Sequence, residues 1–180
     1  MWQQHGVPRE PRPARPLDAA ALDRLALRYV ERFATTRGKL ADYLRRKVRE
    51  RGWHGAPADP ATVAERMAAL GYVDDRAFAD MRAAALARRG FGARRVAQAL
   101  RAAHVGEEDA VAAIEPAAER PLDAALAFAR RRRFGPWAKA APDERLRERQ
   151  VAAMVRAGHA PALARRIVLS PPGVPFEGDE

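Results

Sequence analysis

The sequence contains no cysteine and no asparagine, and serine occurs only once, as Ser170. The lack of cysteine excludes a disulfide framework, thiolate metal sites and a cysteine nucleophile. A single serine, followed by two prolines, leaves most serine hydrolase schemes without a nucleophile. Aromatic residues make up only 7% of the 180 residues. Much of the apolar content is alanine, so the core must be thin and spread along the chain.

Motifs that hold metals or phosphates are also lacking. The histidines lie far apart, at His5, His54, His104 and His159. No pair has the spacing of a zinc site, and Gly38-Lys39 lacks the upstream glycine of a phosphate loop. Asp74 and Asp75 could form a carboxylate pair for a metal, but we interpret them as a helix N-cap and a first-turn acid. We therefore expect no metal, no cofactor and no catalytic residues.

No apolar run approaches the roughly 18 residues that span a bilayer, and the N-terminus lacks the apolar run of a signal peptide. We expect a cytoplasmic protein without a membrane contact. Lys and Arg number 33 against 23 Asp and Glu, which gives a net charge of +10. This charge indicates an anionic partner: nucleic acid first, then a membrane surface or an acidic protein. Some of the arginine could instead reflect a GC-rich coding sequence.

The apolar residues between the two ends of the chain follow a helical period, and no segment alternates as a strand does. We predict nine helices that sort into threes, because the middle helices end near Gly52, His104 and Gly158, about 50 residues apart. The prediction is an all-α protein of three tandem three-helix repeats with an elongated, curved body. A single globular bundle with accidental repeats is the alternative.

The predicted organisation has five parts. A disordered basic arm over 1–16 precedes the repeats, and a flexible tail over 170–180 follows them. The three repeats are expected at 17–71, 72–117 and 118–169. Within them we expect Phe33, Leu70, Phe78 and Met81 to point inward, by the spacing of their helices.

Arginines in the second and third repeats are candidate contacts for a partner or for DNA. They are Arg88, Arg89, Arg94, Arg95, Arg101, Arg130, Arg131, Arg132 and Arg133. Guanidinium groups favour bidentate contacts with phosphate or carboxylate, and an elongated body could align them along a filament or a phosphate backbone. Trp53 and Trp137 lie in predicted loops, where we expect packing rather than stacking on bases.

One part of the chain resembles a known family. Gly71-Tyr72-Val73-Asp74-Asp75, followed by Phe78-Ala79 and by Gly90-Phe91-Gly92, is similar to the central signature of the RecX regulatory proteins. Weaker likenesses to this family extend over residues 22–169. On physical grounds the signature is a structural joint rather than a binding site. Gly71 ends one helix, Tyr72 and Val73 fill the core, and Asp74 starts the next helix.

The resemblance implies an all-helical, non-enzymatic protein that binds filaments of the RecA recombinase and restrains their ATPase and strand exchange. It also allows direct contacts with single-stranded and double-stranded DNA. We expect a monomer. Two other functions stay open: a free-standing helical nucleic-acid-binding protein that needs no recombinase, and a nuclease or other DNA enzyme that uses Asp74.

Overall fold

The computed structural model describes residues 15–176, so most of the expected basic arm and the last residues of the expected tail lie outside it. Over this range the chain forms nine α-helices and one short 3₁₀-helix, and it contains no strand. The elements, in chain order, are α1 (Ala19–Val30), α2 (Arg37–Arg51), α3 (Pro60–Ala69), α4 (Asp75–Ala87), α5 (Ala93–Arg101), α6 (Glu107–Glu119), α7 (Pro121–Arg132), η1 (Gly135–Trp137), α8 (Glu144–Arg156) and α9 (Pro161–Leu169).

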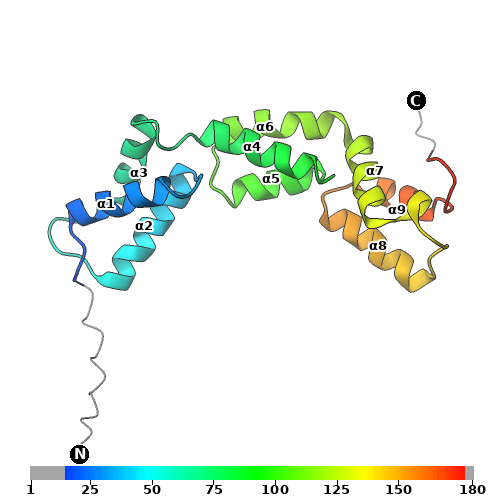
Figure 1. The fold of residues 1–180 in the computed structure, drawn as a ribbon, viewed down its shortest axis with the longest axis horizontal. Coiled ribbons are helices and arrows are strands. Elements are labelled where there is room, and N and C mark those ends of the chain that lie inside the picture. The colour runs from blue at the N-terminus through cyan, green and yellow to red at the C-terminus, as the bar shows by residue number, and fades with distance from the viewer. Residues whose placement is uncertain (1–14, 177–180) are drawn as a thin grey trace, which may run out of the picture.

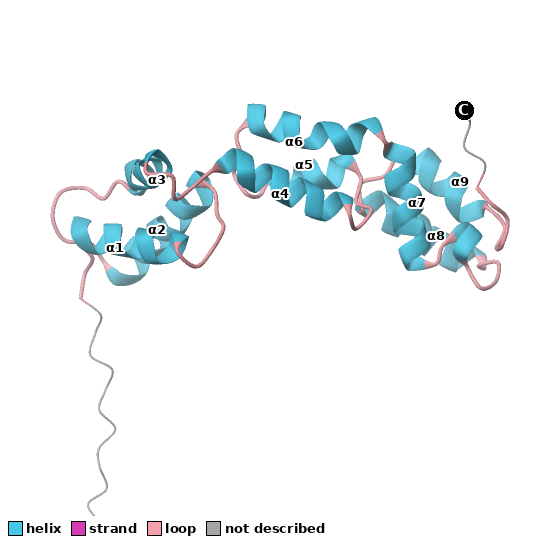
Figure 2. Cartoon of the chain, turned by 45° about the horizontal axis from the view of Figure 1, so that its top comes forward, coloured by secondary structure: helices cyan, strands magenta, loops and turns pink. Residues whose placement is uncertain are grey.

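The helices form three groups of three along an arc (Figure 1). We call α1–α3 the first unit, α4–α6 the second and α7–α9 the third. The groups remain separate when the molecule is turned (Figure 2). Each unit encloses its own small core, and the three cores are distinct clusters. The predicted all-α, elongated and curved architecture of three-helix units is confirmed.

Local sequence explains where several helices begin. The side chains of Asp18, Thr36, Asp59, Asp74 and Asp143 each accept a hydrogen bond from a backbone N–H in the first turn. Such N-caps satisfy donors that have no partner within the helix. Pro60 follows its cap at the first helical position, as the sequence predicts.

The cores are thin because alanine supplies much of the buried surface. Leu22, Leu40 and Leu44 are almost fully buried in the first unit, while Ala79 and Ala83 are buried in the second. Small side chains let helices approach closely but remove little apolar area from water. Trp53 and Trp137 are half-buried and pack against the first and third cores, which confirms packing as the role of these loop tryptophans.

Four side chains that we expected inside are not buried. Phe33, Leu70 and Met81 are exposed, and Phe78 is half-buried against the second core. On α4 the buried stripe consists of Ala79, Ala83 and Leu86, one residue further along than predicted. The buried side of α4 is therefore formed by two alanines and Leu86, in one cluster with Ala113 and Ala117 of α6, and Phe78 packs at the edge of that cluster.

The prediction that Tyr72 fills the core is also wrong. Its side chain is 53% exposed, whereas the neighbouring Val73 is buried. Gly71 has a φ of +79°, as a glycine just past the end of a helix often does. The chain turns sharply there, so only one of the next two side chains enters the core.

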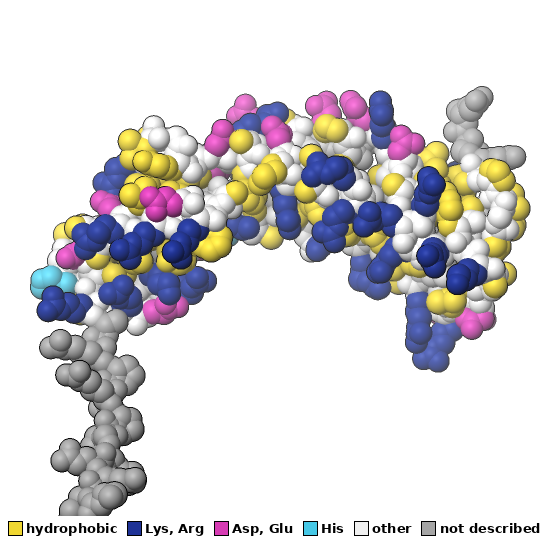
Figure 3. All heavy atoms as spheres, viewed as in Figure 1, with side chains coloured by type: hydrophobic (Ala, Val, Ile, Leu, Met, Phe, Trp, Pro, Cys, Tyr) yellow, Lys and Arg dark blue, Asp and Glu magenta, His cyan; other side chains and the backbone are white. Residues whose placement is uncertain are grey.

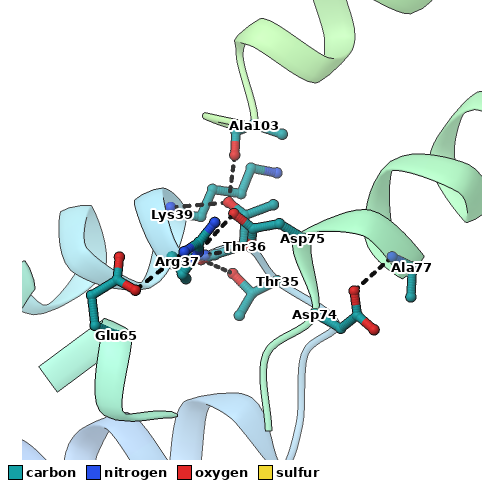
Figure 4. A network of polar contacts seen from close by, with 9 residues as sticks. All are labelled: Thr35, Thr36, Arg37, Lys39, Glu65, Asp74, Asp75, Ala77 and Ala103. Atoms are coloured by element: carbon teal, nitrogen blue, oxygen red, sulfur yellow. Dashed lines mark hydrogen bonds and ion pairs between the residues drawn. The ribbon is translucent and has the colours of Figure 1, made fainter. Parts of the chain in front are cut away.

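The first and second units are joined by a buried polar network (Figure 4). Asp75 is buried and accepts hydrogen bonds from the backbone N–H of Arg37 at 2.9 Å and from its Nε at 3.2 Å. The hydroxyl of Thr36 donates to the carbonyl of Ala103. Hydrogen bonds to Glu65 and then to Asp75 raise the pKa of Arg37. Asp75 is thus more than a first-turn acid, since it connects α4 to the start of α2.

Candidate functional site

The second and third units meet at a groove of about 820 Å³. Its walls come from the loop before α5, from α5 itself and from α7 and α8. Six arginines line it: Arg89, Arg94, Arg95, Arg131, Arg132 and Arg156. No carboxylate is among its lining residues, and Phe91 and Phe128 contribute apolar surface. The groove is therefore strongly positive on both sides.

The groove arginines differ from the basic residues of the first unit. There, Arg45, Arg46 and Arg66 form ion pairs with Asp42, Glu50 and Asp23. Among the described residues, none of the six groove arginines pairs with an acid. Their positive charge is therefore not neutralised locally, and it attracts anions into the groove.

Some guanidinium groups of the groove contact uncharged neighbours, which hold them in place without neutralising their charge. Arg89 lies over the ring of Phe91 at 5.1 Å, and Arg132 lies over Phe128 at 5.9 Å. Arg95 donates from Nη1 to the side-chain oxygen of Gln98 at 2.6 Å. Because flat guanidiniums stack on aromatic rings, their edges remain available for hydrogen bonds to an anion.

Five of the nine predicted contact arginines lie together in this groove. They are Arg89, Arg94, Arg95, Arg131 and Arg132. The other four, Arg88, Arg101, Arg130 and Arg133, are exposed but are not part of its lining. Arg156 was not among the predicted contacts. A sequence signal that could have indicated it is its place as the last residue of α8, which matches the place of the predicted Arg101 at the end of α5.

Acidic residues gather on another side of the second unit. The first turn of α6 contains Glu107, Glu108 and Asp109. Their negative charges interact favourably with the positive end of the helix dipole. Figure 3 shows acidic side chains along the upper edge over α6 and basic side chains on the inner side of the arc below it. The second unit is thus polarised, with its positive side facing the hollow of the curve.

Close backbone contacts hold the two walls of the groove together. Gly92 donates its N–H to the carbonyl of Ala157 at 2.9 Å. A side chain on Gly158 would clash with the backbone of Arg95, and one on Gly92 would clash with Gly158. Glycine is required where two backbones approach so closely. The spacing of the arginines across the groove is therefore set by a glycine contact.

His159 completes this junction. The residue is 3% exposed, and its ring lies 5.6 Å from the ring of Phe128 and places Nε2 3.0 Å from the carbonyl of Gly90. Since a carbonyl only accepts, we assign the proton of the neutral ring to Nε2. Burial lowers the pKa of His159, and the hydrogen bond to Gly90 opposes that effect only in part. The ring is therefore buried in its neutral form.

Protonation of His159 is expected to destabilise the fold. A pKa lowered below the ordinary value of 6.5 means that the unfolded chain binds this proton more readily. The contribution of the neutral His159 ring to the free energy of unfolding is therefore fully present above about pH 6.5. It is lost as the pH falls through the lowered pKa. Urea unfolding between about pH 7.5 and about pH 5.5 should show this decline, and His159→Phe, which keeps a ring, should flatten it. If stability falls with pH in the His159→Phe variant as it does in the wild type, the pH dependence does not come from His159. His54→Gln, at an exposed position, is the control and should decline as the wild type does.

The arrangement of the described residues also bears on metal binding and on membrane-spanning helices. Within residues 15–176 no group of three or more His, Asp or Glu is placed to hold a metal ion. None of the described helices is long and apolar enough to cross a membrane.

Comparison with known proteins identifies the family. The chain is 31% identical over 173 residues to a Regulatory protein RecX of Myxococcus xanthus (strain DK1622), covering 91% of this chain and 92% of that protein. The chain belongs to the RecX family of regulatory proteins. A Regulatory protein RecX of Agrobacterium fabrum (strain C58) is 32% identical over 74% of the chain and 73% of its own length. The suspected family membership is confirmed.

The domain and structure comparisons agree with this. Residues 74–114 match the RecX second three-helix domain, which lies within the second unit described above. A crystal structure of a regulatory protein RecX superposes with a TM-score of 0.52 at 22% identity, over 82% of this chain and 72% of that chain. At this identity the superposition supports the fold. Both RecX relatives are named regulatory proteins rather than enzymes.

Proposed function

We propose that this protein binds filaments of a RecA-type recombinase and restrains their ATPase and strand exchange, without an enzymatic activity or cofactor of its own. The observation that carries the proposal is membership of the RecX family over nine-tenths of the chain. The curved body and its unpaired arginines support it, since such a shape can follow a helical filament. The setting would be homologous recombination in the cytoplasm, with the protein acting as a monomer.

The proposed mechanism is occupation of the filament surface. Three rigid units along an arc would contact several recombinase subunits at once, and the arginines of the inner side would meet acidic protein surface or DNA phosphates. Contacts spread over several subunits oppose any change in their relative positions, because such a change would break contacts. The filament would then hydrolyse ATP and extend more slowly.

DNA-stimulated ATP hydrolysis by the cognate recombinase tests the proposal. Added protein should lower the turnover rate and shorten the filaments seen by electron microscopy, and rising salt should weaken the effect. The variant Arg94→Glu/Arg95→Glu should inhibit less, while Arg45→Glu/Arg46→Glu should inhibit as the wild type does. Turnover and filament length that do not respond to the wild-type protein at low and moderate salt would refute the proposal.

The groove also favours a second candidate function, a nucleic-acid-binding protein that works without a recombinase. Six arginines without acidic partners are typical of a surface that binds phosphates. Tight binding to naked DNA in physiological salt, unchanged by recombinase and accompanied by normal recombinase turnover, would support this alternative over the first.

A further inference from the structure

We propose that the outer face of the third unit is a docking surface for a second copy of this chain, with the two α8 helices side by side and antiparallel. The face is a groove of about 600 Å³ that only α8 and α9 line. It is distinct from the arginine-lined groove, although Val155 and Arg156 contribute to both. Pairing through this face goes beyond the proposed function, because it concerns the free protein.

The residues of α8 that line this face lie on one side of the helix. They recur at intervals of three and four positions, a spacing that aligns side chains along a helix and forms the seam of a coiled coil. They are Glu144, Arg147, Glu148, Val151, Ala152, Val155 and Arg156. Another side of α8 carries Gln150 and Met154, which are buried within the third unit. The stripe is therefore a second seam, and no other unit of the described chain lines it.

The middle of the stripe is apolar and partly open to solvent. Val151 and Ala152 are half-buried, and Val155 is 37% exposed. Leu169, the last residue of α9, adds a side chain that is 58% exposed. Removing such apolar surface from water favours association, and the small side chain of Ala152 lets a second helix approach closely.

The charges at the two ends of the stripe identify the occupant as a second copy. Glu144 is the first residue of α8 and Arg156 is its last. Neither forms an ion pair within residues 15–176. A two-fold interface must be complementary to itself. Antiparallel packing with the axis near Val151 fulfils this condition, because Glu144 of each copy then lies opposite Arg156 of the other copy.

The remaining charged residues of the face are compatible with this arrangement. Glu148 follows Glu144 by one turn and extends the acidic half, while Arg165 of α9 adds a positive group. Arg147 is the exception to the separation of charges along α8. Antiparallel packing places it opposite the small Ala152 of the second copy, and not opposite another arginine.

Pairing through this face is expected to be weak. Each copy carries a net charge of +10, so two copies repel each other over the rest of their surfaces. The face is also small, and we therefore expect a dimer that is abundant at about 300 μM and scarce at about 3 μM. Because Arg156 lines both grooves, the paired form would be a reserve and the monomer would be the form that meets the filament. That last step rests on the proposed function, whereas the pairing does not.

Sedimentation equilibrium of the full chain in about 0.15 M salt tests the pairing. The average mass should rise with concentration from 19.8 kDa towards twice that value and stop there, since a two-fold interface closes after two copies. A mass that stays at the monomer value up to about 300 μM would overturn the proposal, and so would growth beyond the dimer. Because only this protein is present, either failure leaves the proposed function untouched.

Charge reversal identifies the surface. Glu144→Arg and Arg156→Glu should each weaken pairing by at least about tenfold, because each brings like charges together twice in a symmetric dimer. An equimolar mixture of the two variants should pair again. In the mixed dimer, each reversed residue of one variant meets the reversed residue of the other, and the unchanged Arg156 meets the unchanged Glu144. A mixture that remains monomeric would contradict the antiparallel arrangement, as would a single variant that pairs like the wild type.

Matched controls separate this face from net charge and from helix-end effects. Glu107→Arg and Arg101→Glu make the same changes at the first residue of α6 and the last residue of α5, both exposed, and should pair like the wild type. Leu169→Lys provides a test that does not alter the Glu144–Arg156 pair. It adds a positive charge that suits the end of α9 but removes apolar contact, so it should fold and lose pairing. Circular dichroism and thermal unfolding check the fold of each variant. Controls that lose pairing, or a folded Leu169→Lys variant that keeps it, would place the interface elsewhere and refute the proposal.

Discussion

Gly158→Ala is expected to lower the free energy of unfolding by about 3 kcal/mol, through backbone strain and overpacking together. Gly158 has a φ of +97°, which an L-residue rarely adopts. A Cβ at this position would lie 2.6 Å from the backbone nitrogen of Arg95 and 2.8 Å from the carbonyl oxygen of Gly92. Neither neighbour is a flexible side chain, so α5 and the end of α8 would have to separate.

Gly173→Ala is the matched control for this prediction. Gly173 also has a positive φ, of +78°, but nothing lies within 4 Å of the position where its Cβ would be. Its substitution should cost only the conformational strain, about 1 kcal/mol. Chemical denaturation of the two variants measures the difference, which reports the contact between the second and third units. Equal losses of unfolding free energy in both variants would show that the contact between the second and third units contributes nothing to stability.

The same substitution tests the part that the groove plays in the proposed function. Because Gly158 lies where the two walls meet, its replacement should weaken inhibition of the recombinase while leaving all six groove arginines in place. Salt dependence separates the two possible causes. A wider groove would make fewer ionic contacts, so inhibition would depend less on salt, whereas partial unfolding would lower the fraction of active protein and leave the salt dependence unchanged.

Much of the architecture was predictable because it depends on local sequence. N-caps such as Asp59 and Asp74, and the glycine after a helix at Gly71, act within one or two turns of the chain. The repeat of about 50 residues and the apolar spacing then gave the class of fold and the grouping into three-helix units. The family signature was recognisable for the same reason, since it is a continuous joint between two units.

The sequence could not give the features that depend on how helices face one another. The rotation of α4 was predicted one residue off, because Ala79 and Ala83 rather than Phe78 and Met81 are the buried residues. The groove needs α5, α7 and α8 to meet, so no local pattern separated Arg89 from Arg88 or revealed Arg156. Burial of His159 likewise depends on Phe128 and Gly90, which lie far away in the sequence.

Asp75→Ala is expected to destabilise the protein by about 2–3 kcal/mol, because it removes the buried carboxylate of an ion pair whose arginine is partly exposed. The Asp75 side chain is only 6% exposed, and the loss would leave two donors of Arg37 without an acceptor, the backbone N–H and Nε. The value lies at the low end for buried pairs, because the Arg37 side chain is 43% exposed and keeps Glu65.

The neighbouring aspartate provides the comparison that isolates the joint between the first and second units. Asp74 caps α4 through a 2.8 Å hydrogen bond from the N–H of Ala77 and is exposed, so Asp74→Ala should cost about 1 kcal/mol. Urea denaturation of both variants should therefore rank Asp75 above Asp74. Adding Arg37→Ala to Asp75→Ala should cost little more, since the two residues act as one pair. Additive losses would instead mean that Asp75 stabilises α4 alone, and the connection between the two units would then depend on the bond from Thr36 to Ala103.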